Sequence, residues 1–240
     1  MNTYVYGLSI LVATVALGAM LRAIWKTLPM LIWTLRPTAI HSWFLTHLES
    51  DQAVAGSEKL QEWLRRLEAM GFSKIGIKAE RPPLRGRTTL ELALVHTTDN
   101  TYGSIVVDDR GRPLSLYFYT PLTENCIVFT RNGKFAPELE NDAASVRNVV
   151  SDDWNEILAS HRERVSRFVQ QGLTPLVDSS EQSRIEATRL FYTSQYGRKS
   201  VFQLLVYSGI PGIVSLLILI LLLVVAVTSW GVNALLNAPR

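Results

Sequence analysis

The two ends of this chain carry almost no charge. Residues 1–21 and 201–239 contain no Lys, Arg, Asp or Glu, so the 24 basic and 21 acidic residues lie between these segments or at Arg240. Two apolar ends around a polar centre predict a domain tethered by two transmembrane helices. The pattern excludes a plain soluble enzyme and a multi-span transporter. The hydrophobic content of 48% also excludes a disordered chain.

The C-terminal span is the more strongly marked of the two. Residues 201–232 are predicted to form this helix, and residues 213–227 within it are all Ile, Val, Leu or Ala apart from Ser215. A helix of about 20 apolar residues crosses a hydrocarbon core of roughly 30 Å. A buried helix in a soluble protein rarely stays apolar on every face for so long. Residues 233–240 would then form a short outer tail.

Residues 1–25 are predicted to form the first transmembrane helix. The alternative is a cleaved signal peptide, for which the small residues from Ala16 to Ala19 would be a passable cleavage site. A signal peptide needs a basic segment before its apolar core, and no charge precedes Arg22. The sequence therefore favours an uncleaved membrane anchor.

The charges next to the two spans predict their orientation. Arg22, Lys26 and Arg36 follow the first span, and Arg198 and Lys199 precede the second. Basic residues beside a span favour the cytoplasmic side of a membrane. We therefore expect a two-pass protein of the cell membrane, with a cytoplasmic central domain and both termini outside.

Small residues recur at four-residue spacing in the first span. Thr14 and Gly18 form one such pair, and Ser9 and Ala13 form another. This spacing lets helix backbones approach closely in a bilayer. Besides the lipid bilayer, we expect other membrane subunits as partners, or self-association through this span. The alternative is that the span only anchors, because small residues are common in membrane helices.

Residues 26–49 form a connector of mixed character. The segment contains Trp33 and Trp43, two prolines and a few basic residues, and the apolar residues from Ile40 to Leu48 have helical spacing. An amphipathic, Trp-rich stretch suits the bilayer interface. Two alternatives stay open, namely a longer, tilted first span and docking against the membrane surface of a partner.

The central domain is predicted over residues 50–178. Its first helix begins at the N-cap Ser57 and ends at Gly71, and a second amphipathic helix begins at Ser151 or Asp152 and ends at Gly172. Residues 179–200 are predicted to form a helical connector to the second span.

Between these helices the hydrophobic period changes from 3.6 to 2, which indicates strands. Asn132-Gly133 favours a type I′ hairpin after the last of them. The fold class is therefore α+β, an antiparallel meander sheet flanked by amphipathic helices that we expect on one face. The strands are predicted near residues 73–79, 90–96, 102–107, 114–119 and 126–130.

The sequence offers no pattern that indicates catalysis. It lacks the glycine-rich phosphate and dinucleotide loops, the HExxH zinc motif and the GxSxG nucleophile elbow. Cys126 is the only cysteine, and His41, His47, His96 and His161 lack the spacing of a metal pair. We expect no catalytic residue, no cofactor and no metal site, and hence a non-enzymatic protein.

Two groups of side chains are candidates for interaction. Tyr117 and Tyr119 project from one face of the predicted sheet, where they form a binding platform or are covered by a helix of the same domain. Arg81, Arg85 and Arg87 make the densest basic loop, which suits anionic lipid headgroups. Basic and acidic residues nearly balance in the centre of the chain, which argues against nucleic acid as a partner.

These features favour an accessory or scaffolding subunit of a membrane assembly, which presents a cytoplasmic α+β domain. The alternative is a membrane-bound sensor that binds a small ligand between the helices and the sheet.

Overall fold

The structure, a computed structural model, describes residues 3–47, 49, 57–83, 88–133 and 138–236. Within these ranges the side chains of residues 3–13, 204, 207, 208, 211 and 222–236 are not described. The chain divides into two compact units. One comprises Met1–Leu35 with Phe202–Arg240, and the other is the domain Arg36–Val201.

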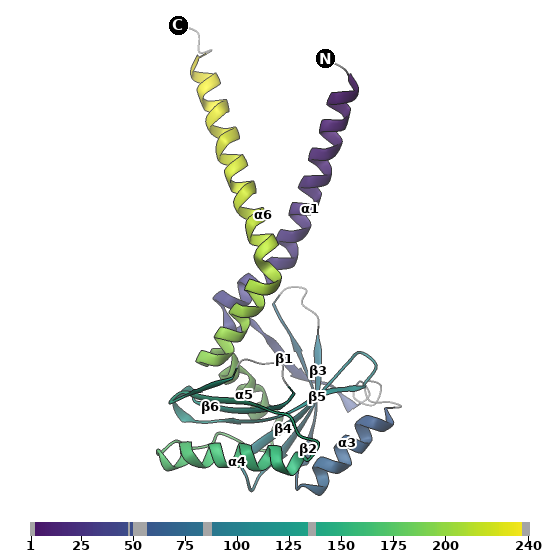
Figure 1. The fold of residues 1–240 in the computed structure, drawn as a ribbon, viewed down its shortest axis with the longest axis vertical. Coiled ribbons are helices and arrows are strands. Elements are labelled where there is room, and N and C mark those ends of the chain that lie inside the picture. Colours follow the sequence, from purple (N-terminus) through teal and green to yellow (C-terminus); the bar gives the residue numbers. More distant parts are fainter. Residues whose placement is uncertain (1–2, 48, 50–56, 84–87, 134–137, 237–240) are drawn as a thin grey trace. The chain divides into compact units, whose positions relative to one another are not determined.

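The first unit is built from two long helices, α1 (Thr3–Leu35) and most of α6 (Gln195–Leu236). Figure 1 shows both helices as long ribbons. They contact each other where the Thr27 hydroxyl donates a hydrogen bond to the Gly209 carbonyl at 3.3 Å. A Cβ on Gly212 would lie 1.9 Å from the Thr27 hydroxyl oxygen. This contact therefore requires the absence of a side chain at Gly212.

One helix in the described part of the chain is long and apolar enough to cross a membrane, over Thr14–Leu35 of α1. An apolar helix near the N-terminus fits either a membrane anchor or a signal sequence. In α6 the described side chains provide only a shorter apolar stretch, Gly212–Leu221. The rest of the predicted second span, residues 222–232, lies outside the described side chains.

The domain is organised around an open sheet of eight strands, mostly antiparallel (Figure 1). The spatial order is β1-β2-β3-β4-β5-β6-β8-β7, and all neighbours are antiparallel except β6 and β8. The strands span β1 His41–Phe44, β2 Ser73–Arg81, β3 Thr89–His96, β4 Thr101–Val107, β5 Pro113–Pro121, β6 Ile127–Asn132, β7 Leu139–Asn141 and β8 Ala144–Val149.

The meander prediction is correct from β2 to β6 and wrong after it. Asn132-Gly133 does not close a hairpin, because β8 pairs with β6 in parallel and β7 forms the sheet edge beyond it. The physical reason is burial. β7 has three residues, of which Glu140 and Asn141 are exposed, whereas Ala144, Ser145 and Val146 of β8 are buried. The more apolar strand occupies the inner place.

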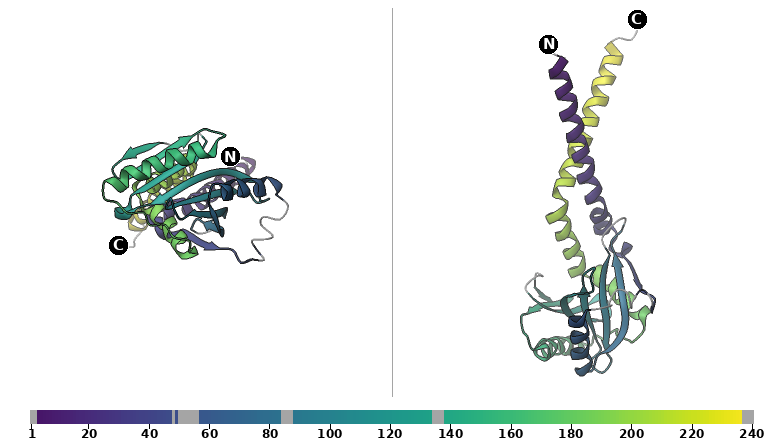
Figure 2. Two further views of the ribbon diagram at one scale, coloured as in Figure 1. Left: turned by 90° about the horizontal axis from the view of Figure 1, so that it is seen from below. Right: turned by 90° about the vertical axis from the view of Figure 1, so that its right-hand side faces the viewer.

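Helices cover both faces of the sheet, so the expectation of helices on one face only is wrong. α3 (Glu58–Ala69) and α4 (Trp154–Gln170) pack on one face, and α5 (Glu181–Thr193) packs on the other (Figure 2). The core under α3 and α4 is aliphatic and aromatic, and Leu67, Leu94 and Phe118 are fully buried in it. The face under α5 carries tyrosines and charges.

Local sequence signals account for the helix ends. The Ser57 side chain accepts a hydrogen bond from the Leu60 amide, as the predicted N-cap should. Gly71 has a φ of +94° at the end of α3, and the Phe72 amide donates to the Leu67 carbonyl. The N-cap of α4 is Asp153, one or two residues after the predicted Ser151 or Asp152.

The helical spacing predicted for Ile40–Leu48 is wrong over its described core. α1 continues to Leu35, a 3₁₀ turn follows at Pro37–Ala39, and His41–Phe44 is the strand β1. The domain therefore includes β1 and α5, both outside the predicted range of residues 50–178. A second 3₁₀ turn, Thr123–Asn125, precedes β6.

The predicted helical connector consists of α5 and the first turns of α6, with Ser194 between them. The Ser194 hydroxyl accepts a hydrogen bond from the Gly197 amide at 3.1 Å. A Cβ on Gly197 would lie 2.0 Å from the Phe191 carbonyl oxygen. The junction between the two helices is therefore short and closely packed.

Candidate functional site

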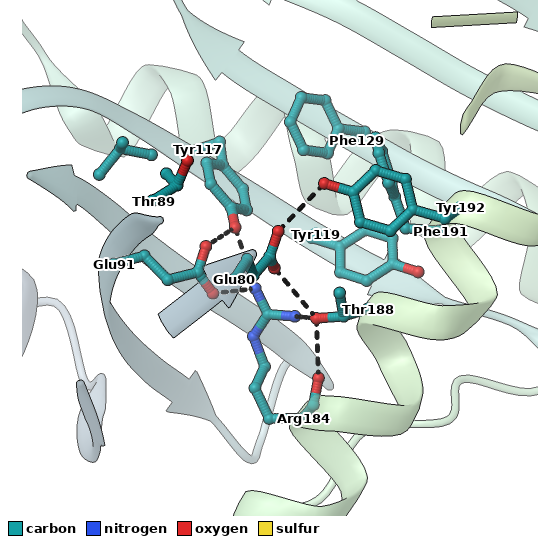
Figure 3. Close-up of a pocket in the computed structure, with 11 residues that line it drawn as sticks. Glu80, Thr89, Glu91, Tyr117, Tyr119, Phe129, Arg184, Thr188, Phe191 and Tyr192 are labelled. Atoms are coloured by element: carbon teal, nitrogen blue, oxygen red, sulfur yellow. Dashed lines mark hydrogen bonds and ion pairs between the residues drawn. The ribbon is translucent and has the colours of Figure 1, made fainter. Parts of the chain in front are cut away.

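A cavity of about 210 Å³ lies between the sheet and α5 (Figure 3). Strands β2 to β6 supply its floor, and α5 supplies the opposite wall. The lining combines charged and aromatic side chains, which Figure 3 shows converging from the two sides. The lining residues are Glu80, Thr89, Glu91, Val106, Tyr117, Tyr119, Phe129, Arg184, Thr188, Phe191 and Tyr192.

The two-residue period of the strands brings these groups to one face. In β3, Leu90 and Leu92 pack in the core under α3 and α4, so Glu91 between these two leucines points towards α5. In β5, Phe118 belongs to that same core, and Tyr117 and Tyr119 face the cavity. The sequence thus places polar groups on the α5 face by alternation alone.

A buried ion pair joins α5 to the sheet. The Arg184 Nη2 atom lies 2.7 Å from the Glu91 Oε1 atom, and their side chains are 2% and 6% exposed. Arg184 also donates to the Ser104 hydroxyl at 3.1 Å. Lys78 of β2, which is fully buried, lies 2.8 Å from the same Glu91 oxygen. One carboxylate therefore holds two buried cations.

A second carboxylate, Glu80, stands nearer the solvent. Its side chain is 15% exposed and pairs with the Lys78 ammonium. The Tyr192 hydroxyl donates to Glu80 at 3.0 Å. The Thr188 hydroxyl lies between the two halves of the cluster and accepts hydrogen bonds from Lys78 and Arg184. Two acidic and two basic groups thus form one connected network.

The electrostatics of this network fix its protonation. Burial alone would raise the pKa of Glu91, but the charges of Arg184 and Lys78 outweigh it and lower the pKa. Burial, together with the charge of Glu91, raises the pKa of Tyr117 well above its ordinary value. Burial and the charge of Glu80 do the same to Tyr192. Glu91 is thus a carboxylate at neutral pH, and both tyrosines are hydrogen-bond donors.

A separate polar cluster lies on the opposite face of the sheet, under α4. His161 is fully buried, and its two ring nitrogens lie 3.0 Å and 2.7 Å from the Thr120 and Thr130 hydroxyls. Arg164 is 2% exposed and donates to the Ser145 hydroxyl at 3.1 Å and to Thr130. Burial lowers the pKa of Arg164 to about 10, so it remains charged. This cluster fastens α4 to β5, β6 and β8.

We predict a loss of stability in mild acid that His161 causes. Burial, and then the charge of Arg164, lower the pKa of His161 well below its ordinary value, so the folded state keeps the ring neutral. The unfolded ring binds a proton below a pH of about 6.5. Acid therefore favours unfolding, by about 1.4 kcal/mol per pH unit below that value.

Urea unfolding at pH 7.5 and pH 5.5 measures this effect. The His161→Gln variant should show a smaller difference between the two pH values than the wild type, whatever its absolute stability. His47→Gln, at an exposed position, should keep the wild-type difference. An unchanged difference in His161→Gln would mean that another group carries the acid sensitivity.

The sequence-predicted interaction residues fall into different places. Tyr117 and Tyr119 lie at the cavity under α5. A helix of the same domain therefore covers them, which is the second of the two environments that the sequence allowed. The Tyr119 hydroxyl donates to the Ala187 carbonyl at 2.8 Å, and Tyr119 is 2% exposed. Trp43 is half-buried in β1, stacks on His41 and lies under the Arg81 guanidinium. Arg85 and Arg87 lie outside the described residues.

Thr14 and Gly18 are not part of the described contact between α1 and α6. Both are exposed, and no described atom lies within 4 Å of a Cβ built on Gly18. The side chain of Ala13 lies outside the described part. Trp33 is buried, at 7% exposure. The approach of the two helices occurs at Thr27, nearer the domain in sequence.

Several residues of the site were not predicted. Lys78, Glu80, Glu91 and Arg184 received no role in the sequence analysis, although a signal existed for two of them. Lys78 lies between Ile77 and Ala79, and Glu91 lies between two leucines. A charge at alternate positions of an otherwise buried strand indicates a buried network. Arg184 gave no such signal, because α5 is mostly polar.

The three arginines of α4 lie in different surroundings. Arg164 is buried, Arg162 pairs with Asp99, and Arg167 pairs with Glu140. Cys126 is 5% exposed, and burial raises the pKa of its thiol. His96 lies 3.3 Å from Asp99, away from the hydroxyls that hold His161.

In the described ranges, no three His, Cys, Asp or Glu side chains gather closely enough to hold a metal ion. The arrangement at the cavity offers aromatic surfaces, carboxylate oxygens and protonated tyrosines, which are groups for binding. Comparison with known protein families, curated proteins and solved structures found nothing that matches this chain.

Proposed function

We propose that this chain is a membrane-anchored sensor whose domain binds a small ligand in the cavity between the sheet and α5. The observation that supports it is the convergence of charged and aromatic side chains on one cavity of about 210 Å³. A pocket with a few placed polar groups among apolar ones is typical of ligand sites. Four lining residues belong to α5, which continues into α6 after one residue.

We further propose that α1 and α6 both cross the cell membrane, with the domain in the cytoplasm and the termini outside. The support comes from sequence and from helix length. α6 extends to Leu236 as one helix, and residues 201–239 carry no charge. The basic residues next to the spans lie on the domain side.

Cysteine labelling tests this topology. In a Cys126→Ala background, an impermeant thiol reagent added to intact cells should label a cysteine at Asn237 and not one at Ser166, an exposed position of α4. Lysed cells should label both positions. Labelling of Ser166→Cys alone in intact cells would show the opposite orientation. Labelling of both positions in intact cells would contradict the proposal that α6 crosses the membrane.

Co-purification tests the ligand-binding function. Native mass spectrometry of the gently solubilised full chain, prepared from its native membrane, should reveal a bound small molecule. Val106→Phe, which adds a ring to the cavity lining, should lose that molecule. Leu114→Phe is the matched control, because Leu114 is 63% exposed. Equal retention in both variants, or no bound molecule in any of them, would contradict the proposal.

A non-enzymatic scaffolding role is the second candidate, and the surroundings of Gly18 favour it. Among the described residues, no atom lies within 4 Å of a Cβ at this position, so we propose that the helix of another subunit or of a second copy packs here. Membrane helices associate largely through such close packing.

We predict that Gly18→Leu weakens association with such a partner and leaves the domain folded. A leucine side chain is compatible with the lipid environment, but its bulk prevents the backbone of a neighbouring helix from approaching closely. Gly212→Leu is the comparison, because it should instead separate α1 from α6 of the same chain. Co-purification from mild detergent, read beside proteolysis of the domain, separates the two results. Full recovery of all partners with Gly18→Leu would show that the first span is only an anchor.

A further inference from the structure

We infer that the ligand of the cavity is a small organic cation, such as an amino or quaternary ammonium alcohol. This inference rests on the proposed ligand-binding function and specifies the chemistry of the same site. Three independent properties of the lining support it, namely its aromatic rings, the state of its polar groups and its size.

The first property is a continuous aromatic wall. The ring centroids of Tyr117 and Phe129 lie 5.0 Å apart, those of Phe129 and Phe191 lie 5.5 Å apart, and those of Phe191 and Tyr192 lie 5.1 Å apart. Tyr119 contacts Phe191 edge to face at 5.9 Å. Aromatic faces carry negative electrostatic potential and attract cations. Five such rings from both sides of a cavity favour a positively charged guest.

The domain already uses this chemistry within the same cluster. The guanidinium carbon of Arg184 lies 5.2 Å from the centroid of the Tyr102 ring and 5.8 Å from that of Tyr119. A buried cation is therefore compatible with the tyrosine face of the sheet. The cavity extends from this point to Phe129, Phe191 and Tyr192 (Figure 3).

The second property is that most hydrogen-bond donors of the cluster are engaged, whereas its carboxylates have acceptor capacity left. Tyr117 donates to Glu91 and Tyr192 to Glu80. The cations of Lys78 and Arg184 are 0% and 2% exposed and point at carboxylates. Each carboxylate has about four lone-pair sites. Glu80, at 15% exposure, is the charged group that a ligand reaches most easily.

The third property is size. The cavity of about 210 Å³ is smaller than the roughly 300–1,000 Å³ of pockets for drug-sized molecules. A cation with a short polar arm fits this volume, whereas a nucleotide or a lipid does not.

Choline and its uncharged isostere, 3,3-dimethylbutan-1-ol, are the probes that test the inference. Both have the same shape and the same hydroxyl, and only choline is charged. Isothermal titration calorimetry on the full chain in maltoside detergent, without choline lipids, should give at least about tenfold tighter binding of choline. Glu80→Gln should weaken choline binding about tenfold and leave the binding of the isostere unchanged.

Two further variants keep the test decisive. Glu62→Gln, at an exposed position of α3, is the matched control for the loss of one carboxylate and should bind choline as the wild type does. Phe191→Leu removes a ring without removing a charge, and should weaken choline more than the isostere. If Glu80→Gln does not fold, Phe191→Leu provides the test of the cationic ligand in its place.

The outcomes separate the inference from the proposed function. Equal binding of choline and the isostere would overturn the cationic ligand and leave a ligand-binding domain in place. Binding of neither probe would also overturn the inference, and the co-purification experiment with Val106→Phe would then decide the proposed function by itself. Choline binding that survives both Glu80→Gln and Phe191→Leu would place the cation outside this cavity and overturn the inference.

Discussion

Replacing Arg184 with methionine is expected to lower the free energy of unfolding of the domain by about 3–5 kcal/mol. The guanidinium is 2% exposed and holds Glu91, Ser104 and Thr188 at once. Of the described partners, its removal leaves the Glu91 carboxylate, which is 6% exposed, with the Lys78 cation and the Tyr117 hydroxyl. A buried charge that loses a partner costs more than the pair contributed.

Urea unfolding of the full chain, followed by tyrosine and tryptophan fluorescence, measures this loss. Arg189→Met in the same helix is the control, because Arg189 is 52% exposed and pairs with an equally exposed Glu186; its effect should stay within about 1 kcal/mol. The double variant Arg184→Met/Glu91→Gln should recover part of the stability, since no carboxylate is left buried. A single variant as stable as Arg189→Met would mean that the ion pair does not hold α5 on the sheet.

Phe118→Ala is expected to destabilise the domain by about 3–5 kcal/mol. Phe118 is fully buried in the centre of β5, stacked on Phe72 at 5.4 Å and 6.1 Å from the ring of His161. The substitution removes the apolar contacts and leaves a cavity between α3, α4 and the sheet. Close-packed interiors relax only partly around such a cavity.

Leu114→Ala is the matched control on the same strand and at the same alternation. Leu114 is 63% exposed at the beginning of β5, so its truncation should change stability by no more than about 0.5 kcal/mol. Thermal and urea unfolding of the two variants give the comparison. Similar losses in both would show that the aliphatic and aromatic side under α3 and α4 is not the core of the domain.

The parts of the fold that depend on neighbours in sequence were predictable. Ser57 and Gly71 define the ends of α3, and the alternation around Leu92 and Phe118 assigns each strand its inner face. Such signals are local, because a cap or a strand period involves residues only a few positions apart.

The parts that depend on competition between distant segments were not predictable. Asn132-Gly133 has the composition of a hairpin, yet β8 takes the place beside β6 because it buries more apolar surface than β7. The sequence around β1 predicts a helix, because four residues are too few to show a period of two clearly. Its pairing with β2 comes from the sheet and not from its own sequence.

The candidate site was predicted only in part. Strand alternation places Tyr117 and Tyr119 on one face of the sheet, and this placement fits both a binding platform and coverage by a helix. The charged partners were not found, because Arg184 lies 93 residues after Glu91 and nothing in α5 shows which face of the sheet it covers. A site assembled from five strands and a later helix is a property of the topology.

The junction at Ser194 has a consequence for chain length. The first turn of α6 is packed so closely on the end of α5 that Gly197 has no room for a side chain. An inserted residue therefore cannot be accommodated as a loop between the two helices. An α-helix turns by about 100° per residue. One residue inserted into this turn would therefore rotate all of α6 beyond it by about 100° about its axis, and a deletion would rotate it as far the other way. The number of residues here sets the angular phase of the rest of α6, and we expect this turn, Gly197 apart, to tolerate substitutions better than insertions.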